Sequence, residues 1–142
     1  MEAYFATFPG VRKYMDEVVE RAKETGYVET VYHRRRDLPE LKSSNFNLRA
    51  FGERVALNMP IQGAAADVMK LAMTAVSRRL KAEGLAARLV LQVHDELIVE
   101  CPESEGARVA AILAEEMEGV AALSVPLSAE AHIGRNWLEA KG

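Results

Sequence analysis

The stretch Arg88-Leu-Val-Leu-Gln-Val-His-Asp-Glu-Leu-Ile-Val-Glu-Cys101 decides the fold class. Apolar and polar positions alternate over 88–93 and again over 96–101, which is the period of two half-buried strands. The break at His94-Asp95 predicts a tight hairpin tip. Two-residue hairpin turns need positive φ and favour Asn-Gly, Asp-Gly or a leading Gly. His-Asp is therefore a poor turn sequence, which indicates that function fixed the choice.

Helices are predicted on both sides of this hairpin, because apolar residues recur at spacings of three and four. One helix covers 11–23, after Pro9-Gly10 and before Gly26. Another begins at the capping residues Ser43, Ser44 and Asn45, runs to about Asn58, and is interrupted by Pro60. The sequence then predicts a long helix from Gly63 to Gly84 and a shorter one over 107–117.

Two other segments have strand patterns. Residues 27–31 are β-rich and lie beside an arginine run, which predicts a second hairpin that returns through Leu38-Pro39. Alternation over 125–133 predicts a final strand before Trp137. The expected fold is α/β (α+β), an antiparallel sheet with helices packed on one face.

Length and composition set the limits. The 142 residues, 15.7 kDa in mass, include 49% apolar and 27% charged residues, enough for one domain with a modest core. No apolar run is long enough to span a bilayer, so we expect no membrane partner. The single cysteine, Cys101, excludes a disulfide framework and fits a cytoplasmic protein. The three histidines are too far apart in the sequence to indicate a histidine metal cage.

Charge is unevenly distributed along the chain. Residues 1–54 hold ten Lys/Arg against nine Asp/Glu, residues 55–92 hold five against two, and residues 93–142 hold three against ten. A basic footprint over the whole domain is therefore absent. The asymmetry is compatible with a phosphate-binding surface beside a cation-binding carboxylate site. The alternative is that these charges are solvated faces of ordinary elements.

The triplet His94-Asp95-Glu96 is the first candidate site. Carboxylate oxygens on an exposed, stiffly held tip suit a hard cation such as Mg²⁺. Successive strand residues point to opposite faces, so we expect Asp95 to ligate directly and Glu96 to assist. A charged turn without a role is the alternative for the isolated tripeptide.

Basic and amide side chains form two further candidates. Arg54, Asn58 and Gln62 are four residues apart and line one stripe if the helix persists, with Arg49 nearby. Arg, Asn and Gln are the residues that contact phosphates, sugars and base edges. The run Arg34-Arg35-Arg36 on a hairpin fits binding to a phosphate backbone. A polar solvent face and a solvated turn are the respective alternatives.

Read together, these blocks resemble one family. The pattern comprises Tyr4-Phe-Ala-Thr-Phe-Pro-Gly-Val11, Gly26-Tyr-Val-Glu-Thr30, the arginine run, Asn58-Met-Pro-Ile-Gln-Gly-Ala-Ala-Ala-Asp67 and Leu91-Gln-Val-His-Asp-Glu-Leu97. In this order and spacing it closely resembles the C-terminal end of the family A DNA polymerases, the family of bacterial DNA polymerase I. The resemblance extends over essentially the whole chain, through Trp137-Leu138.

The resemblance implies a role for each candidate. Asp95 would be one of two catalytic aspartates that hold a pair of Mg²⁺ ions, Glu96 the neighbouring acid, and His94 a contact to the primer terminus. Arg54, Asn58 and Gln62 would line the minor groove of a primer–template duplex, and the arginine hairpin would contact the template backbone. The chemistry would be nucleotidyl transfer from a dNTP in DNA replication and repair.

The chain departs from the family pattern in two ways. His33 stands where the family commonly has Gly, and Asp37 where an aromatic residue is frequent. In addition, the family's other aspartate motif, its fingers helix, and the thumb and exonuclease domains are absent from this sequence. Residues 1–142 are thus expected to be one partial domain, a C-terminal palm segment with an incomplete metal site.

Three hypotheses follow. The leading one is a polymerase palm segment that is inactive alone and associates with the missing polymerase segments, or with a second copy through its uncovered surfaces. The second is a non-catalytic module that binds duplex DNA with the minor-groove surface. The third, a metal phosphohydrolase built on His94-Asp95, needs further His and Asp ligands that the pattern does not supply.

Overall fold

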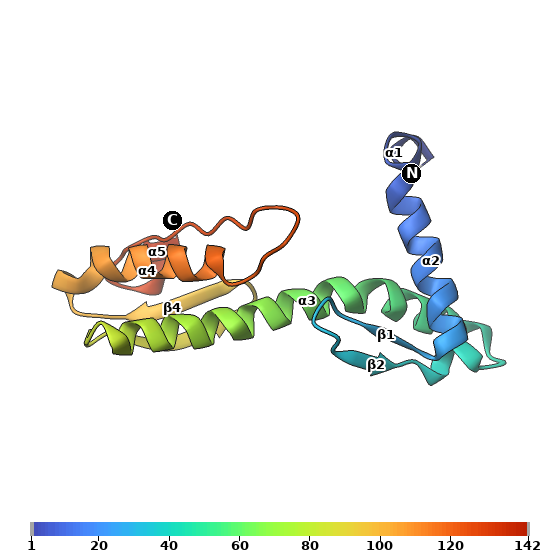
Figure 1. The fold of residues 1–142 in the computed structure, drawn as a ribbon, viewed down its shortest axis with the longest axis horizontal. Helices are drawn as coiled ribbons and strands as arrows, with labels where there is room; N and C mark the ends of the chain where they lie inside the picture. The colour runs from blue at the N-terminus through green and yellow to red at the C-terminus, as the bar shows by residue number, and fades with distance from the viewer. Residues whose placement is uncertain (1, 142) are drawn as a thin grey trace. The chain divides into compact units, whose positions relative to one another are not determined.

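The structure, a computed structural model, describes residues 2–141 as two compact units that meet in sequence between Ala66 and Asp67. Each unit combines helices with a two-stranded antiparallel sheet (Figure 1). The expected mixture of helices and antiparallel strands is therefore confirmed, although the strands form two separate ribbons. The assignment of residues 1–142 to one partial domain stays a prediction.

Unit 1 begins with two helices, α1 (Glu2–Thr7) and α2 (Pro9–Thr25). The predicted helix over 11–23 is confirmed and extends by two residues at each end. Pro9 lies in the first turn, where a missing N–H costs nothing. Gly26 ends the helix with φ 84°, and its N–H donates to the Ala22 carbonyl at 2.8 Å.

A small hairpin and a short 3₁₀ turn follow α2. Strands β1 (Tyr27–Glu29) and β2 (Arg35–Asp37) pair antiparallel, as predicted, and η1 (Pro39–Lys42) comes next. The core of unit 1 lies between these elements, α2 and the first half of α3. Its buried members are Ala22, Val28, Leu38, Leu41 and Ala56.

Helix α3 (Phe46–Ala82) corrects the predicted break at Pro60. Asn45 caps the helix, since its Oδ1 accepts hydrogen bonds from the N–H groups of Asn47 (2.9 Å) and Leu48 (3.4 Å). Pro60 removes one backbone donor but does not end the helix. Residues just before it, Val55, Ala56 and Met59, pack in the core of unit 1, and this packing outweighs the local preference.

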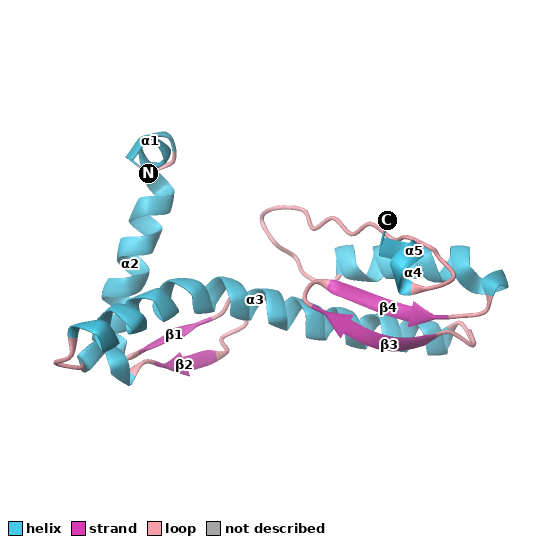
Figure 2. Ribbon diagram, turned by 180° about the vertical axis from the view of Figure 1, so that it is seen from behind, coloured by secondary structure: helices cyan, strands magenta, loops and turns pink. Residues whose placement is uncertain are grey.

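Unit 2 contains the second ribbon and its covering helices (Figure 2). Strands β3 (Arg88–Val93) and β4 (Glu96–Glu100) pair antiparallel as predicted, with a bulge between Leu89 and Leu91. The elements that follow are η2 (Glu103–Glu105), α4 (Gly106–Gly119) and α5 (Trp137–Lys141). The core of unit 2 is built around the buried cluster of Val76, Leu80, Ala87, Val109 and Ile112. None of the helices described is long and apolar enough for a membrane crossing.

The predicted strand over 125–133 is wrong. Residues 121–136 contain neither helix nor strand, and the Val125 and Ile133 side chains are each 63% exposed. Strand geometry needs a neighbour that accepts and donates backbone hydrogen bonds. Here the Ala129 N–H instead donates to Oε1 of Glu118 on α4, at 3.0 Å.

An ion-pair network joins α3 to α4 in unit 2. Glu83 accepts hydrogen bonds from Arg79 and Arg108, and Arg79 also donates to Glu116 at 2.8 Å and Glu115 at 3.4 Å. The hydrogen bond from Arg108, which has the largest effect, and the one from Arg79 lower the pKa of Glu83 to about 2. Shared partners make such a network more favourable than isolated surface pairs.

This network predicts an acid-sensitive step in the stability of unit 2. The pKa of Glu83 in the unfolded chain has its ordinary value of 4.5. The contribution of Glu83 to the free energy of unfolding is therefore complete above pH 4.5 and is lost as the pH falls toward 2. Between neutral pH and about pH 2, the melting temperature should therefore fall more steeply for the native chain than for Glu83→Gln. The exposed Glu103→Gln variant is the control and should follow the native curve. Equal slopes for the native chain and Glu83→Gln would contradict the assignment.

Candidate nucleic-acid interface and acidic hairpin tip

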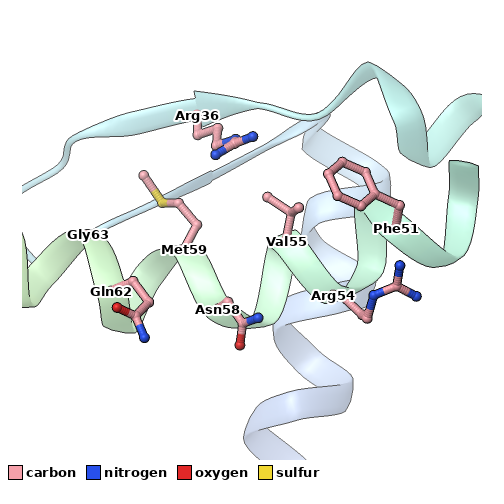
Figure 3. Close-up of a pocket in the computed structure, with 8 residues that line it drawn as sticks. All are labelled: Arg36, Phe51, Arg54, Val55, Asn58, Met59, Gln62 and Gly63. Carbon is pink, nitrogen blue, oxygen red and sulfur yellow. The ribbon is translucent and has the colours of Figure 1, made fainter.

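A pocket in unit 1 brings the arginine hairpin to the helix stripe. Arg54, Asn58 and Gln62 are exposed on successive turns of α3, and Arg36 reaches the same pocket from β2 (Figure 3). The pocket has a volume of about 500 Å³. The continuous helix that the sequence analysis missed is what keeps Asn58 and Gln62 in one stripe across Pro60.

The floor of this pocket is apolar. Phe51, Val55 and Met59 lie on the side of α3 that faces the hairpin, and Gly63 completes the row (Figure 3). Sequence reasoning missed these residues, although their spacing of four was readable as one helix face. The Arg36 guanidinium lies above this apolar floor, and the polar groups of Arg54, Asn58 and Gln62 lie beside it. Such a pocket can accept a ligand that has both carbon-rich and phosphate-bearing parts. A nucleic-acid backbone is such a ligand.

The three hairpin arginines have different surroundings. The Arg35 guanidinium lies 3.7 Å from the centre of the Tyr27 ring, and its Nε donates to Asp37 Oδ1 at 2.8 Å. Asp37, the residue that departs from the family pattern, is therefore a direct partner of one proposed phosphate ligand. Only Arg36 of the three lines the pocket, and Arg34 is exposed on the hairpin.

Arg49 is held by its own backbone neighbourhood. Its Nη1 donates to the carbonyl oxygens of Ser43 (2.9 Å) and Ser44 (3.2 Å), just before α3. These bonds satisfy carbonyls in the turn that leads into the helix. Arg49 does not line the pocket, so its expected contact to DNA stays a prediction.

The hairpin tip of unit 2 has the backbone that its sequence predicted. His94 has φ 52°, in the left-handed region, and the Gln92 side chain donates to the His94 carbonyl at 2.6 Å. Val93 and Glu96 form the last cross-strand pair, so His94 and Asp95 make the turn. A histidine in this region is costlier than a glycine, and that cost indicates a functional site.

The two acidic residues of the tip lie in different surroundings. Asp95 is exposed on the turn, whereas Glu96 is half-buried and forms an ion pair with Lys141 of α5 at 3.7 Å. The expected division between a direct ligand and a helper stays a prediction. Carboxylate oxygens fit Mg²⁺ chemically, but within residues 2–141 no group of three or more His, Cys, Asp or Glu side chains is placed to hold a metal ion. A complete site would need ligands beyond those described.

The model of the family described as DNA polymerase family A matches residues 1–139. The chain belongs to DNA polymerase family A. The resemblance read from the sequence is thus confirmed.

Individual relatives support the same family. DNA polymerase I of Geobacillus stearothermophilus is 54% identical over 141 residues, and that of Bacillus subtilis is 49% identical over 141 residues. In both cases the match covers 99% of this chain and 16% of the relative. The solved POL domain of Pol1 from M. smegmatis, in complex with DNA primer-template and dNTP, superposes with a TM-score of 0.96 at 47% identity. That match covers all of this chain and 25% of the solved chain.

The backbone at His94 leads to a stability prediction. Replacing His94 with Gly should slow amide exchange in β3 and β4 and stabilise the hairpin by about 1 kcal/mol, because Gly adopts positive φ without the steric cost that other residues meet. His132→Gly is the matched control, since His132 is not among the described residues with positive φ. It should leave exchange unchanged or faster. Faster exchange in His94→Gly would show that His94 stabilises its own turn.

Proposed function

We propose that this chain is a palm segment of a DNA-directed DNA polymerase and that its pocket in unit 1 holds the primer–template duplex. The pocket carries the proposal, because it joins Arg36 from the hairpin to Arg54, Asn58 and Gln62 on α3. The M. smegmatis relative, 47% identical, was solved with primer–template DNA and dNTP, which supports this class of ligand.

Each side chain then has a role suited to its chemistry. Arg54, Asn58 and Gln62 contact sugars and minor-groove edges, where acceptors are shared between base pairs, so they sense pair shape more than sequence. Arg36 contacts a backbone phosphate, and Arg34, Arg35 and Arg49 add to the positive field along the backbone. The apolar floor packs against the carbon faces of deoxyribose.

The hairpin tip supplies the catalytic carboxylates in this proposal. Asp95 would hold Mg²⁺ through its carboxylate oxygens, Glu96 would stay beside it with Lys141 as its partner, and His94 would lie at the primer terminus. When bound, Mg²⁺ lowers the barrier by stabilising charge on the attacking and departing oxygens. The overall transfer joins the primer 3′-oxygen to the α-phosphorus of a dNTP and releases pyrophosphate.

A non-catalytic duplex-binding module is the second candidate. One observation favours it for the chain alone, namely that the pocket lies within unit 1, whereas the described part of the acidic tip lacks a third ligand. Both candidates predict that the chain alone binds DNA and does not extend a primer. They differ in a longer polymerase that contains this segment, where only the first predicts that extension depends on Asp95. Several apolar side chains of unit 2 are exposed, and we propose that other polymerase segments cover them, or a second copy when this chain is alone. They are Val90, Leu91, Val125, Ile133 and Leu138.

Binding to DNA tests the pocket. Arg36→Ala should weaken binding of the chain to a fluorescent primer–template duplex roughly tenfold, the loss expected for one charge-assisted contact, and should reduce the salt dependence by about one phosphate. Arg21→Ala, an exposed arginine of the same unit, is the control and should bind as the native chain does. If both variants lose affinity equally, the pocket is not the duplex site.

Primer extension tests the tip. The chain alone should show no Mg²⁺-dependent incorporation of dNTP. In a longer polymerase that contains this segment, Asp95→Asn should lower incorporation by at least about a hundredfold, since the substitution removes one charged ligand, while duplex affinity stays near that of the unmodified enzyme. Glu103→Gln serves as a control for loss of an exposed carboxylate. Full turnover by Asp95→Asn would exclude the ligand role.

A further inference from the structure

Thr30 organises the turn that carries the arginine run. Its side chain is only 3% exposed, and its Oγ1 accepts hydrogen bonds from the N–H groups of Tyr32 (3.2 Å) and Arg34 (3.3 Å). Its backbone N–H donates to the Arg34 carbonyl at 3.0 Å, and its carbonyl accepts from the His33 N–H at 2.9 Å. The residue therefore fixes the start of β2 through four separate bonds.

The methyl group of Thr30 lies directly against α3. A Cβ added at Gly63 would lie 2.6 Å from Thr30 Cγ2, whereas the next atoms, Cε and Sδ of Met59, would be at ordinary contact distances of 3.5 and 3.7 Å. The hairpin can approach α3 this closely only because residue 63 has no side chain. Gly63 follows Gln62 and itself lines the pocket.

A second close contact holds the other end of the same segment. A Cβ at Gly52 would lie 3.0 Å from Leu41 Cδ2 and 3.2 Å from Glu40 Cβ, in η1. Gly52 and Gly63 are eleven residues apart, or about 16 Å along a helix. The segment from β1 to η1 is thus held on α3 at two points, and the Thr30–Gly63 contact is the one beside the arginine turn.

We propose that Thr30 and Gly63 are positioning residues for the duplex site, because their contact sets the spacing between Arg36 and the stripe of Arg54, Asn58 and Gln62. This inference rests on the proposed duplex-binding function. Neither residue needs to touch DNA. A side chain at position 63 lifts the turn from α3 and moves Arg36 with it. Arg36 and the stripe on α3 can then no longer contact the same duplex.

A compensating pair of substitutions tests the contact. Gly63→Ala should weaken binding to a fluorescent primer–template duplex roughly tenfold, as if the Arg36 contact were lost, and should reduce the salt dependence by about one phosphate. Thr30→Ser keeps Oγ1 and removes the methyl, so it should bind without measurable loss. The double variant should recover the affinity of Thr30→Ser, because the atom that meets the new Cβ is gone.

The control separates this effect from stability. Gly10→Ala makes the same change in unit 1 where nothing lies within 4 Å of the new Cβ, and it should not alter binding. The added Cβ costs packing energy, so affinity is measured at a temperature at which circular dichroism shows Gly63→Ala to be fully folded. A loss of affinity in the folded variant is a result that a loss of folding does not give. Native affinity for Gly63→Ala, or no recovery in the double variant, would overturn the proposal.

A measurement without DNA keeps the inference distinct from the proposed function. Nuclear Overhauser contacts between Arg36 and the Met59 methyl should be present in the native chain, lost in Gly63→Ala and restored in the double variant. If the native chain does not bind the duplex but these contacts follow that pattern, the proposed function fails and the positioning contact stands. Contacts that persist unchanged in Gly63→Ala would refute the positioning role directly.

Discussion

The close approach of a backbone hairpin to α3 is the constraint on which the candidate DNA site depends. Gly52, Ala56 and Gly63 have small side chains or none where the hairpin and η1 approach the helix, and Ala56 is completely buried there. Dense packing at such a face tolerates little added volume. Because the hairpin lies on this face, the pocket opens beside it, and the adjacent face of α3 is left to Arg54, Asn58 and Gln62.

The acidic tip follows a different physical rule. Its position depends on a turn that places a histidine at positive φ, and residues in such costly backbone conformations cluster at functional sites. Asp95 is left exposed while Glu96 is paired with Lys141. The chain spans 16% of the Geobacillus relative, and no group of three or more His, Cys, Asp or Glu side chains among the described residues is placed to hold a metal ion.

Short-range signals in the sequence predicted much of this structure. Alternation and spacing predicted both hairpins and helices α2 and α4, and the two-residue length of the turn at His94-Asp95 predicted the positive φ. The wrong predictions concern segments whose structure depends on contacts between residues far apart in the sequence. Packing of Val55, Ala56 and Met59 carries α3 through Pro60, and residues 125–133 alternate without a neighbouring strand to pair with. The sequence also could not show that Arg35 bonds to Asp37 while Arg36 reaches the pocket.

Titration of the isotopically labelled chain with a primer–template duplex, followed by nuclear magnetic resonance, tests the central claim most directly. We expect the side-chain amide signals of Asn58 and Gln62 and the Nε–H signals of Arg36 and Arg54 to shift together and to saturate at one duplex per chain. The Nε–H signal of Arg21 on α2 should stay in place. Shifts centred on other surfaces, with these four side chains unchanged at saturation, would contradict the account.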